Sequence, residues 1–142
     1  MSLAMTEHER EAFLADLHVA VISIERADGP PLAVPIWYGY EPGALVWIIT
    51  SPESLKGRLL QAAGRFSLCV QTEEPPLYKY VSVEGPIIDT APADLETERR
   101  PLAYRYFGQE MGDLYLAGTD EAGSRFSMRP ERWWTVDYAK LG

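Results

Sequence analysis

The chain has 142 residues, of which 46% are hydrophobic, and this length suits one domain with a substantial core. Its 13 Lys and Arg against 21 Asp and Glu give a net charge of −8, which disfavours nucleic acid and anionic lipid surfaces as partners. The single cysteine, Cys69, lies in an apolar run and excludes an intrachain disulfide. No apolar run reaches the roughly 18 residues that span a bilayer, and no secretion signal is present, so we expect a cytoplasmic protein.

The first predicted elements are a helix and three strands. Residues 1–5 are expected to be disordered or a leader added before the natural start, and they are given no structural role. Thr6 and Glu9 form a capping-box pattern that predicts the start of a helix. β-Branched and aromatic residues between turn clusters then predict strands over residues 18–25, 32–40 and 44–50. Their short connections predict that consecutive strands are antiparallel neighbours.

Pro35 lies within the second predicted strand. Because proline has no N–H to donate to a ladder, it belongs at a sheet edge, a bulge or an opening in a barrel. Such an interruption is a place where another molecule can dock.

A helix is predicted after the third strand. Ser51 is the expected N-cap, and Gly64 is the expected end of the helix. The inward apolar face is predicted to consist of Leu55, Leu59, Leu60 and Ala63.

The second half of the chain is predicted to alternate again between strands and helix. Strands are expected over residues 65–72 and 77–89, and a helix over residues 92–117 is expected to be broken by Pro101 and Gly108. Residues 124–138 are expected to form one long strand or two short strands around a bend at residues 129–131. This element order favours a single domain over residues 1–142, mostly β with flanking helices, built as a small closed or split antiparallel barrel.

The start of the helix after the third strand has the chemistry of an anion site. Ser51 and Ser54 lie where backbone N–H groups are free, and Lys56 and Arg58 follow two positions apart. The alternative is a capped surface helix that carries two solvated cations.

Aromatic and apolar residues of the second strand are candidates for contact with a planar ring. The proline in the run Val34-Pro35-Ile36-Trp37 leaves neighbouring backbone groups unpaired, although core packing at a bulge is the alternative. Trp133 and Trp134, adjacent in a predicted strand, should point to opposite faces. No histidine or cysteine spacing indicates a metal or a nucleophile, so any redox chemistry would come from a cofactor.

Several of these motifs together resemble the pyridoxamine 5′-phosphate oxidase-like split-barrel flavoproteins. The resemblance covers roughly Glu11 to Tyr138 and is carried by the following segments: Pro35-Ile36-Trp37, Thr50-Ser51, Ser54-Leu55-Lys56-Gly57-Arg58-Leu59-Leu60 and Tyr80-Val81-Ser82-Val83-Glu84-Gly85. Members of the family are homodimers that bind FMN, or a deazaflavin coenzyme, in grooves between the two subunits. The resemblance therefore implies a homodimer with the cofactor at the subunit interface.

The resemblance also implies roles for individual residues. Ser54, Lys56 and Arg58 would hold the cofactor phosphate, and residues 34–37 would line its ring. The full set of implied cofactor contacts is Val34, Pro35, Ile36, Trp37, Thr50, Ser51, Ser54, Leu55, Lys56, Arg58, Lys79, Tyr80 and Trp133. No side chain is assigned a catalytic role, and no metal site is expected.

The carboxy-terminal segment departs from the true pyridoxamine phosphate oxidases. Those enzymes end with a Trp-x-x-x-Arg-Leu-x-Pro pattern that helps to bind their substrate, whereas residues 129–138 here lack it. The chain is more similar to the general flavin or deazaflavin reductases of the superfamily. We therefore expect an oxidoreductase that transfers hydride to or from a small organic substrate, with FMN as the first cofactor and a deazaflavin as the second. The alternatives are a non-enzymatic dimeric barrel that binds flavin, haem or another ligand, and an obligate dimer without a ligand.

Overall fold

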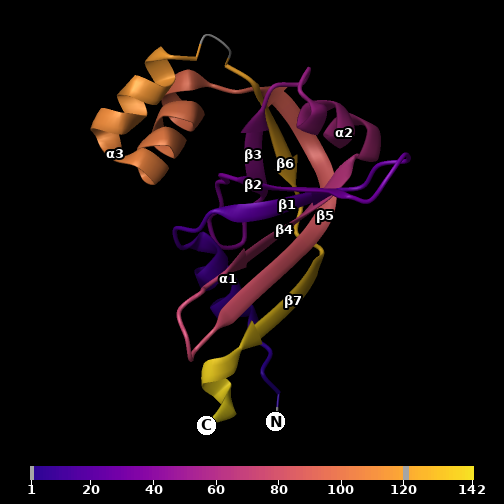
Figure 1. Cartoon of the computed structure of the whole chain (residues 1–142), viewed down its shortest axis with the longest axis vertical. Helices are drawn as coiled ribbons and strands as arrows, with labels where there is room; N and C mark the ends of the chain where they lie inside the picture. Colours follow the sequence, from indigo (N-terminus) through magenta and orange to yellow (C-terminus); the bar gives the residue numbers. More distant parts are fainter. Residues whose placement is uncertain (1, 120–121) are drawn as a thin grey trace.

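The computed structural model of the chain describes residues 2–119 and 122–142 and contains an antiparallel seven-stranded sheet with flanking helices (Figure 1). In chain order the elements are α1 (Glu7–Ala15), β1 (Ala20–Ile24), β2 (Leu32–Ile36), β3 (Val46–Thr50), α2 (Leu55–Ala63), β4 (Arg65–Gln71), β5 (Lys79–Pro92), the short helical segment η1 (Leu95–Arg99), α3 (Arg100–Ala117), β6 (Ser124–Met128), β7 (Arg132–Asp137) and the one-turn segment η2 (Tyr138–Leu141). The expected mostly β, antiparallel split-barrel architecture is confirmed. None of the helices in the described ranges is long and apolar enough to cross a membrane.

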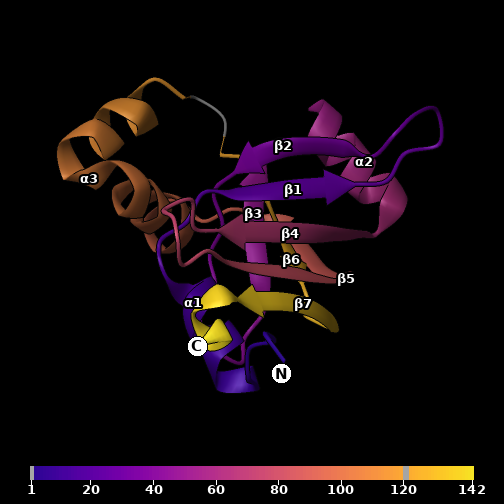
Figure 2. The same ribbon diagram turned by 60° about the horizontal axis from the view of Figure 1, so that its bottom comes forward.

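The 14-residue strand β5 belongs to both halves of the sheet. Its first half pairs with β4 on one side and with β7 on the other. Beyond an irregularity between Ile87 and Asp89, its second half pairs with β6, which in turn pairs with β3. As a result β3 and β6 run across β2, β1, β4, the first half of β5 and β7, which lie side by side in that order in Figure 2.

The barrel is split between β2 and β3, which are consecutive in sequence. The prediction that these two strands are antiparallel neighbours is wrong: β2 pairs with β1 and β3 pairs with β6. An isolated bridge joins Trp47 of β3 to Gly39, which lies beyond the end of β2. The buried Tyr38 explains the split, because its hydroxyl donates to the Leu14 carbonyl at 2.6 Å and anchors the chain beside α1. The second strand consequently ends at Ile36 rather than at residue 40, and Pro35 lies on an edge strand as expected.

The core fills the space between the two halves of the sheet. Alternating side chains of the strands point inward, among them Ile22, Leu68 and Val83 from one half and Ile48 and Phe126 from the other. Leu14 of α1 and Leu60 of α2, both completely buried, join the same cluster. Each such side chain contributes about 1.5–3 kcal/mol through removal of its apolar surface from water.

Helix α2 begins three residues later than its capping pattern suggested. Its N-cap is Ser54, not Ser51, because the Ser54 hydroxyl accepts from the Gly57 amide at 3.1 Å and donates to the Ser51 carbonyl at 2.7 Å. Leu55 is 47% exposed, so it does not belong to the inward face to which it was assigned. A side chain at Gly57 would meet the Ser51 carbonyl at 2.0 Å, so glycine is what lets the helix start pack against residues 51 and 52. Gly64 ends the helix in the left-handed region, as predicted.

Helix α3 is bent back on itself at Gly108. Gly108 has φ 79° and ψ 173°, outside the helical region, which confirms the predicted break. Pro101 does not break the helix, because it lies in the first turn, where its missing N–H has no partner to lose. The two halves of α3 contact each other through Tyr104, whose ring lies against Gly112 and whose hydroxyl donates to Asp113. The resulting helical hairpin projects from one side of the barrel (Figure 1).

In residues 2–5, Leu3 and Met5 contact β7 and the core, whereas Ser2 and Ala4 are exposed; Met1 lies outside the described residues. The Leu3 carbonyl accepts from the Asp137 amide and the Met5 amide donates to the Thr135 hydroxyl, each at 2.8 Å. Met5 is buried in the core cluster. The segment therefore runs alongside β7 and links the two ends of the chain.

Candidate functional site

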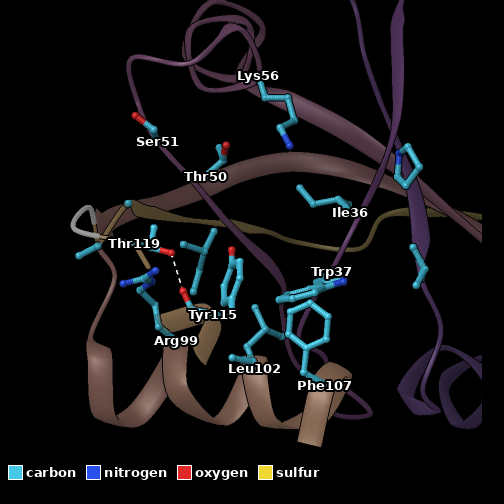
Figure 3. Close-up of a pocket in the computed structure, with 16 residues that line it drawn as sticks. Ile36, Trp37, Thr50, Ser51, Lys56, Arg99, Leu102, Phe107, Tyr115 and Thr119 are labelled. Atoms are coloured by element: carbon cyan, nitrogen blue, oxygen red, sulfur yellow. Dashed lines mark hydrogen bonds between the residues drawn. The ribbon is translucent and has the colours of Figure 1, made fainter. Parts of the chain in front are cut away.

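The candidate site is a pocket of about 430 Å³ between β2, the end of β3, the start of α2 and the helical hairpin α3 (Figure 3). It is lined by Val19, Pro35, Ile36, Trp37, Ile49, Thr50, Ser51, Lys56, Arg99, Leu102, Ala103, Phe107, Tyr115, Thr119, Ala122 and Gly123. Small-molecule and cofactor sites usually have volumes of roughly 300–1,000 Å³ and mix an apolar lining with a few polar groups. The pocket meets both criteria.

Lys56 supplies positive charge on one wall of the pocket. The Ser54 cap starts α2 so that Lys56 falls in the first turn of the helix, and its side chain extends into the pocket (Figure 3). In the described part of the chain, the Lys56 amine has no ion-pair or hydrogen-bond partner. The Thr50 hydroxyl, at the end of β3, lies nearby and contacts the Ser54 hydroxyl at 3.3 Å. A cation and hydroxyls at a helix start can hold a phosphate.

Trp37 forms the aromatic wall of the pocket. Its ring lies nearly parallel to that of Tyr106, with an interplanar angle of 4° and 5.0 Å between centroids. The centroid of the Phe107 ring lies 4.8 Å from that of Trp37, with the two rings nearly perpendicular, and the centroid of the Tyr115 ring lies 5.3 Å from it. Trp37 is half-buried and does not belong to the core cluster, because its indole packs against α3 and lines the pocket. Its contact with a planar ring stays a prediction.

The first half of α3 is fixed to the barrel by two side chains. The Tyr106 hydroxyl donates to the His18 carbonyl at 2.6 Å, and the Arg105 guanidinium donates to the Ala15 carbonyl at 2.7 Å. Burial raises the pKa of Tyr106 above its ordinary value, so the phenol keeps the proton that it donates. These bonds hold the α3 wall of the pocket in place against Trp37.

The structure brings together six of the thirteen expected cofactor contacts. The residues that line the pocket are Pro35, Ile36, Trp37, Thr50, Ser51 and Lys56. The residues outside its lining are Val34, Ser54, Leu55, Arg58, Lys79, Tyr80 and Trp133. Ser54 has both its donor and its acceptor capacity engaged in capping α2, whereas Arg58 points to solvent on the exposed side of that helix.

Leu55 is exposed at the start of α2, and the remaining expected contacts, Val34, Lys79, Tyr80 and Trp133, lie on the sheet. Val34 packs against the core cluster, and Lys79 lies 3.9 Å from the Asp137 carboxylate. Trp133 also packs against the core, with the Arg10 guanidinium 4.5 Å above its ring. Its neighbour Trp134 is 51% exposed, so the prediction that the two tryptophans face opposite sides is confirmed.

Sequence reasoning missed the α3 wall of the pocket. That wall is contributed by Arg99, Leu102, Ala103, Phe107 and Tyr115. A signal was available in the aromatic density of residues 104–115, which contain Tyr104, Tyr106, Phe107 and Tyr115. That signal does not show where the helix docks. The docking depends on ring contacts with Trp37, which lies 78 positions before Tyr115 in the sequence, and local patterns do not report contacts over such a separation.

Comparison with known proteins shows the fold. No known sequence family and no curated protein matches the chain. Among solved structures, a conserved hypothetical protein from Mycobacterium tuberculosis is similar, with a TM-score of 0.80, 21% identity and coverage of 99% of this chain and 89% of that chain. An F420 reductase has a TM-score of 0.61 at 20% identity, covering 87% of this chain and 94% of that chain. A FAD-binding protein from Mesorhizobium loti has a TM-score of 0.64 at 20% identity, covering 94% of each chain.

The similarity extends over nearly the whole chain, and a pyridoxamine 5′-phosphate oxidase-like protein is among the structures that share it. The chain thus has the split-barrel fold that these structures share, and the fold expected from the resemblance in its sequence is confirmed.

Proposed function

We propose that this protein is an oxidoreductase that binds a flavin-type cofactor and transfers hydride to or from a small organic substrate in the cytoplasm. FMN is the first cofactor and a deazaflavin of the F420 type is the second. The observation that carries the proposal is the joint presence of unpaired Lys56 and the aromatic face of Trp37 in one pocket of about 430 Å³, among the described residues. The names of an F420 reductase and a FAD-binding protein among the structural neighbours support the same cofactor class.

The residues of the pocket fit such a cofactor. The Lys56 amine and the Thr50 hydroxyl would hold its phosphate, and residues 35–37 would lie along its ring. Because β2 is an edge strand, it has outward-facing backbone groups available to the polar edge of the ring. When bound, a flavin or deazaflavin supplies the hydride chemistry, and the chain binds it, orients it and excludes water through Trp37 and the α3 wall.

The proposal includes a homodimer with the cofactor near the subunit interface. A row of residues in register crosses the outer face of the sheet from one strand to the next: Pro35, Val21, Cys69, Ser82 and Trp134. Val21 and Trp134 are 42% and 51% exposed, and Pro35 belongs both to this row and to the pocket. A second copy seated on the row would cover apolar surface and close the open side of the pocket. The continuity of the row with the pocket is what favours a second copy as the partner.

The experiment that tests the proposal measures cofactor binding to the purified protein. The wild type is titrated with FMN and with F420, and binding is followed by the absorption band and fluorescence of each cofactor. We expect one of them to bind and the variant Lys56→Ala to bind it at least about tenfold more weakly, since hydrogen bonds to charged groups contribute about 1.5–3 kcal/mol. Lys56→Arg should retain most of the affinity, and Arg129→Met, at an exposed arginine outside the pocket lining, should retain all of it.

Three results would count against the proposal. A wild-type protein that binds neither cofactor removes the function, and a Lys56→Ala variant that binds normally removes the site. Cofactor that binds but is not reduced or reoxidised in the presence of NADPH and a panel of quinones would favour the non-enzymatic ligand-binding barrel.

A further inference from the structure

We propose that Arg99 binds the anionic group of the substrate, and that the substrate is a small organic anion with a planar, apolar body. This inference rests on the proposed function, and it assigns the α3 wall of the same pocket. Arg99 is outside the motifs that carry the family resemblance.

Among the described residues, Arg99 is a cation without an ion pair at the end of η1, and the charged residues on either side of it are paired. Both of its neighbours in the sequence form ion pairs: Glu98 contacts Arg125, and Arg100 contacts Glu96 at 3.1 Å and Asp113 at 3.4 Å. In the ranges 2–119 and 122–142, the Arg99 guanidinium has no hydrogen bond or ion pair, although it is half-buried at the pocket. An uncompensated guanidinium in a chain of net charge −8 is a suitable partner for a carboxylate or phosphate, which it can bind in a bidentate manner.

Arg99 and Lys56 lie on opposite sides of the pocket. Lys56 extends from α2, whereas Arg99 lies at the end of η1, on the α3 side (Figure 3). If the cofactor phosphate is at Lys56 and the ring lies along residues 35–37, the surface left for the substrate is the α3 wall. A second anion at Arg99 would then belong to the substrate rather than to the cofactor.

The side chains beside Arg99 define the rest of the substrate. Leu102 is nearly buried, and Phe107 and Tyr115 present half-exposed rings to the pocket. These rings are 5.5 Å apart and inclined by 60°, so they form a corner rather than a flat platform. Such a corner suits the edge and one face of a small planar molecule, because aromatic pairs prefer offset or edge-to-face contact.

The test compares an anion with its neutral counterpart on the cofactor-loaded protein. Benzoate and benzamide have nearly the same shape and differ in charge, and their binding is measured by isothermal titration calorimetry. We expect the wild type to prefer benzoate. In Arg99→Met, benzoate should bind at least about tenfold more weakly while benzamide binding is unchanged, because one charge-assisted contact is lost. Arg99→Lys should keep part of the preference, and the surface variant Arg129→Met should keep all of it.

Each other outcome overturns the assignment. A wild type without a preference for benzoate, or an Arg99→Met variant with the preference intact, removes Arg99 as the anion site. Loss of the cofactor itself from folded Arg99→Met would assign Arg99 to the cofactor instead. The absorbance of bound cofactor, measured before any benzoate is added, separates these cases from failure of the proposed function, in which the wild type takes up no cofactor at all. Circular dichroism confirms that each variant is folded.

Discussion

The ring of Trp37 lies nearly parallel to that of Tyr106, with 5.0 Å between their centroids, and the Tyr106 hydroxyl donates to the His18 carbonyl at 2.6 Å. One side chain of α3 thus contacts both Trp37 and the segment that joins α1 to β1. This pair joins the projecting hairpin to the barrel, and the pocket wall depends on it.

Removal of the Tyr106 hydroxyl should loosen α3. We expect Tyr106→Phe to lower the free energy of unfolding by about 1 kcal/mol, because the hydroxyl loses its hydrogen bond to the His18 carbonyl and its long contacts with the Tyr38 backbone at 3.4 Å, while the ring contact with Trp37 remains. Tyr106→Ala should cost about 3 kcal/mol, because the aromatic packing is lost as well. Urea unfolding measures both values. Tyr78→Phe, at an exposed tyrosine, is the matched control and should be neutral; equal effects of the two Phe variants would contradict the prediction.

Ser54 should contribute to stability as the N-cap of α2. Ser54→Ala removes the acceptor of the Gly57 amide and should lower the free energy of unfolding by about 1 kcal/mol. Ser54→Thr can still accept that bond and should keep most of the stability. Thermal melts of the cofactor-free variants separate this structural role from any role in phosphate binding. No change in Ser54→Ala would mean that the capping bond does not stabilise the helix.

The outer row of the sheet should control the oligomeric state. Val21→Asp introduces a charge on this exposed face, between Pro35 and Cys69 of the row, so we expect the proposed dimer to dissociate with little change in the stability of each subunit. Leu77→Asp, at an exposed leucine in the turn before β5, is the matched control and should remain dimeric. Size-exclusion chromatography with light scattering distinguishes the two states. A dimeric Val21→Asp variant would exclude the row as the interface.

Glu9 should make part of the stability dependent on pH. The ion pair with Lys140, at 2.7 Å, and hydrogen bonds with Thr6 lower the pKa of Glu9 from 4.5 to about 2. Because the folded-state pKa is depressed, this stabilisation is fully present above pH 4.5 and is lost as the pH falls toward 2. The melting temperature of Glu9→Gln should therefore be lower than that of the wild type at pH 6, and the difference should shrink below pH 4.5.

The control for this prediction is Glu7→Gln, in the same turn of α1, since Glu7 forms no ion pair in the described residues. It should show no comparable pH dependence. A constant difference between Glu9→Gln and the wild type from pH 6 to pH 3 would contradict the assignment.

Local features of the fold could be predicted from the sequence. The capping box of Thr6 and Glu9, the end of α2 at Gly64 and the break at Gly108 each depend on residues within one or two turns. The edge position of Pro35 follows from its missing donor. The N-cap of α2 was misplaced because Ser51 and Ser54 offer the same side-chain chemistry, and the tight turn that links them decides between the two.

Long-range pairing could not be predicted in the same way. β3 joins β6, which lies more than 70 residues later in the chain, because Tyr38 anchors the segment after β2 beside α1. The α2 side of the pocket was found through its motif of hydroxyls and cations. The α3 side, including Arg99 and Phe107, was missed because it depends on how the hairpin docks against Trp37.

The shared strand β5 has a consequence for how the chain comes apart and assembles. Since the same fourteen residues complete both halves of the sheet, neither half has all its backbone partners without them. We therefore expect no fragment that stops before Lys79 to hold a stable shape, even though it contains β1 to β4 and both preceding helices. We expect those strands to reach their final pairing during synthesis only after β5 has emerged.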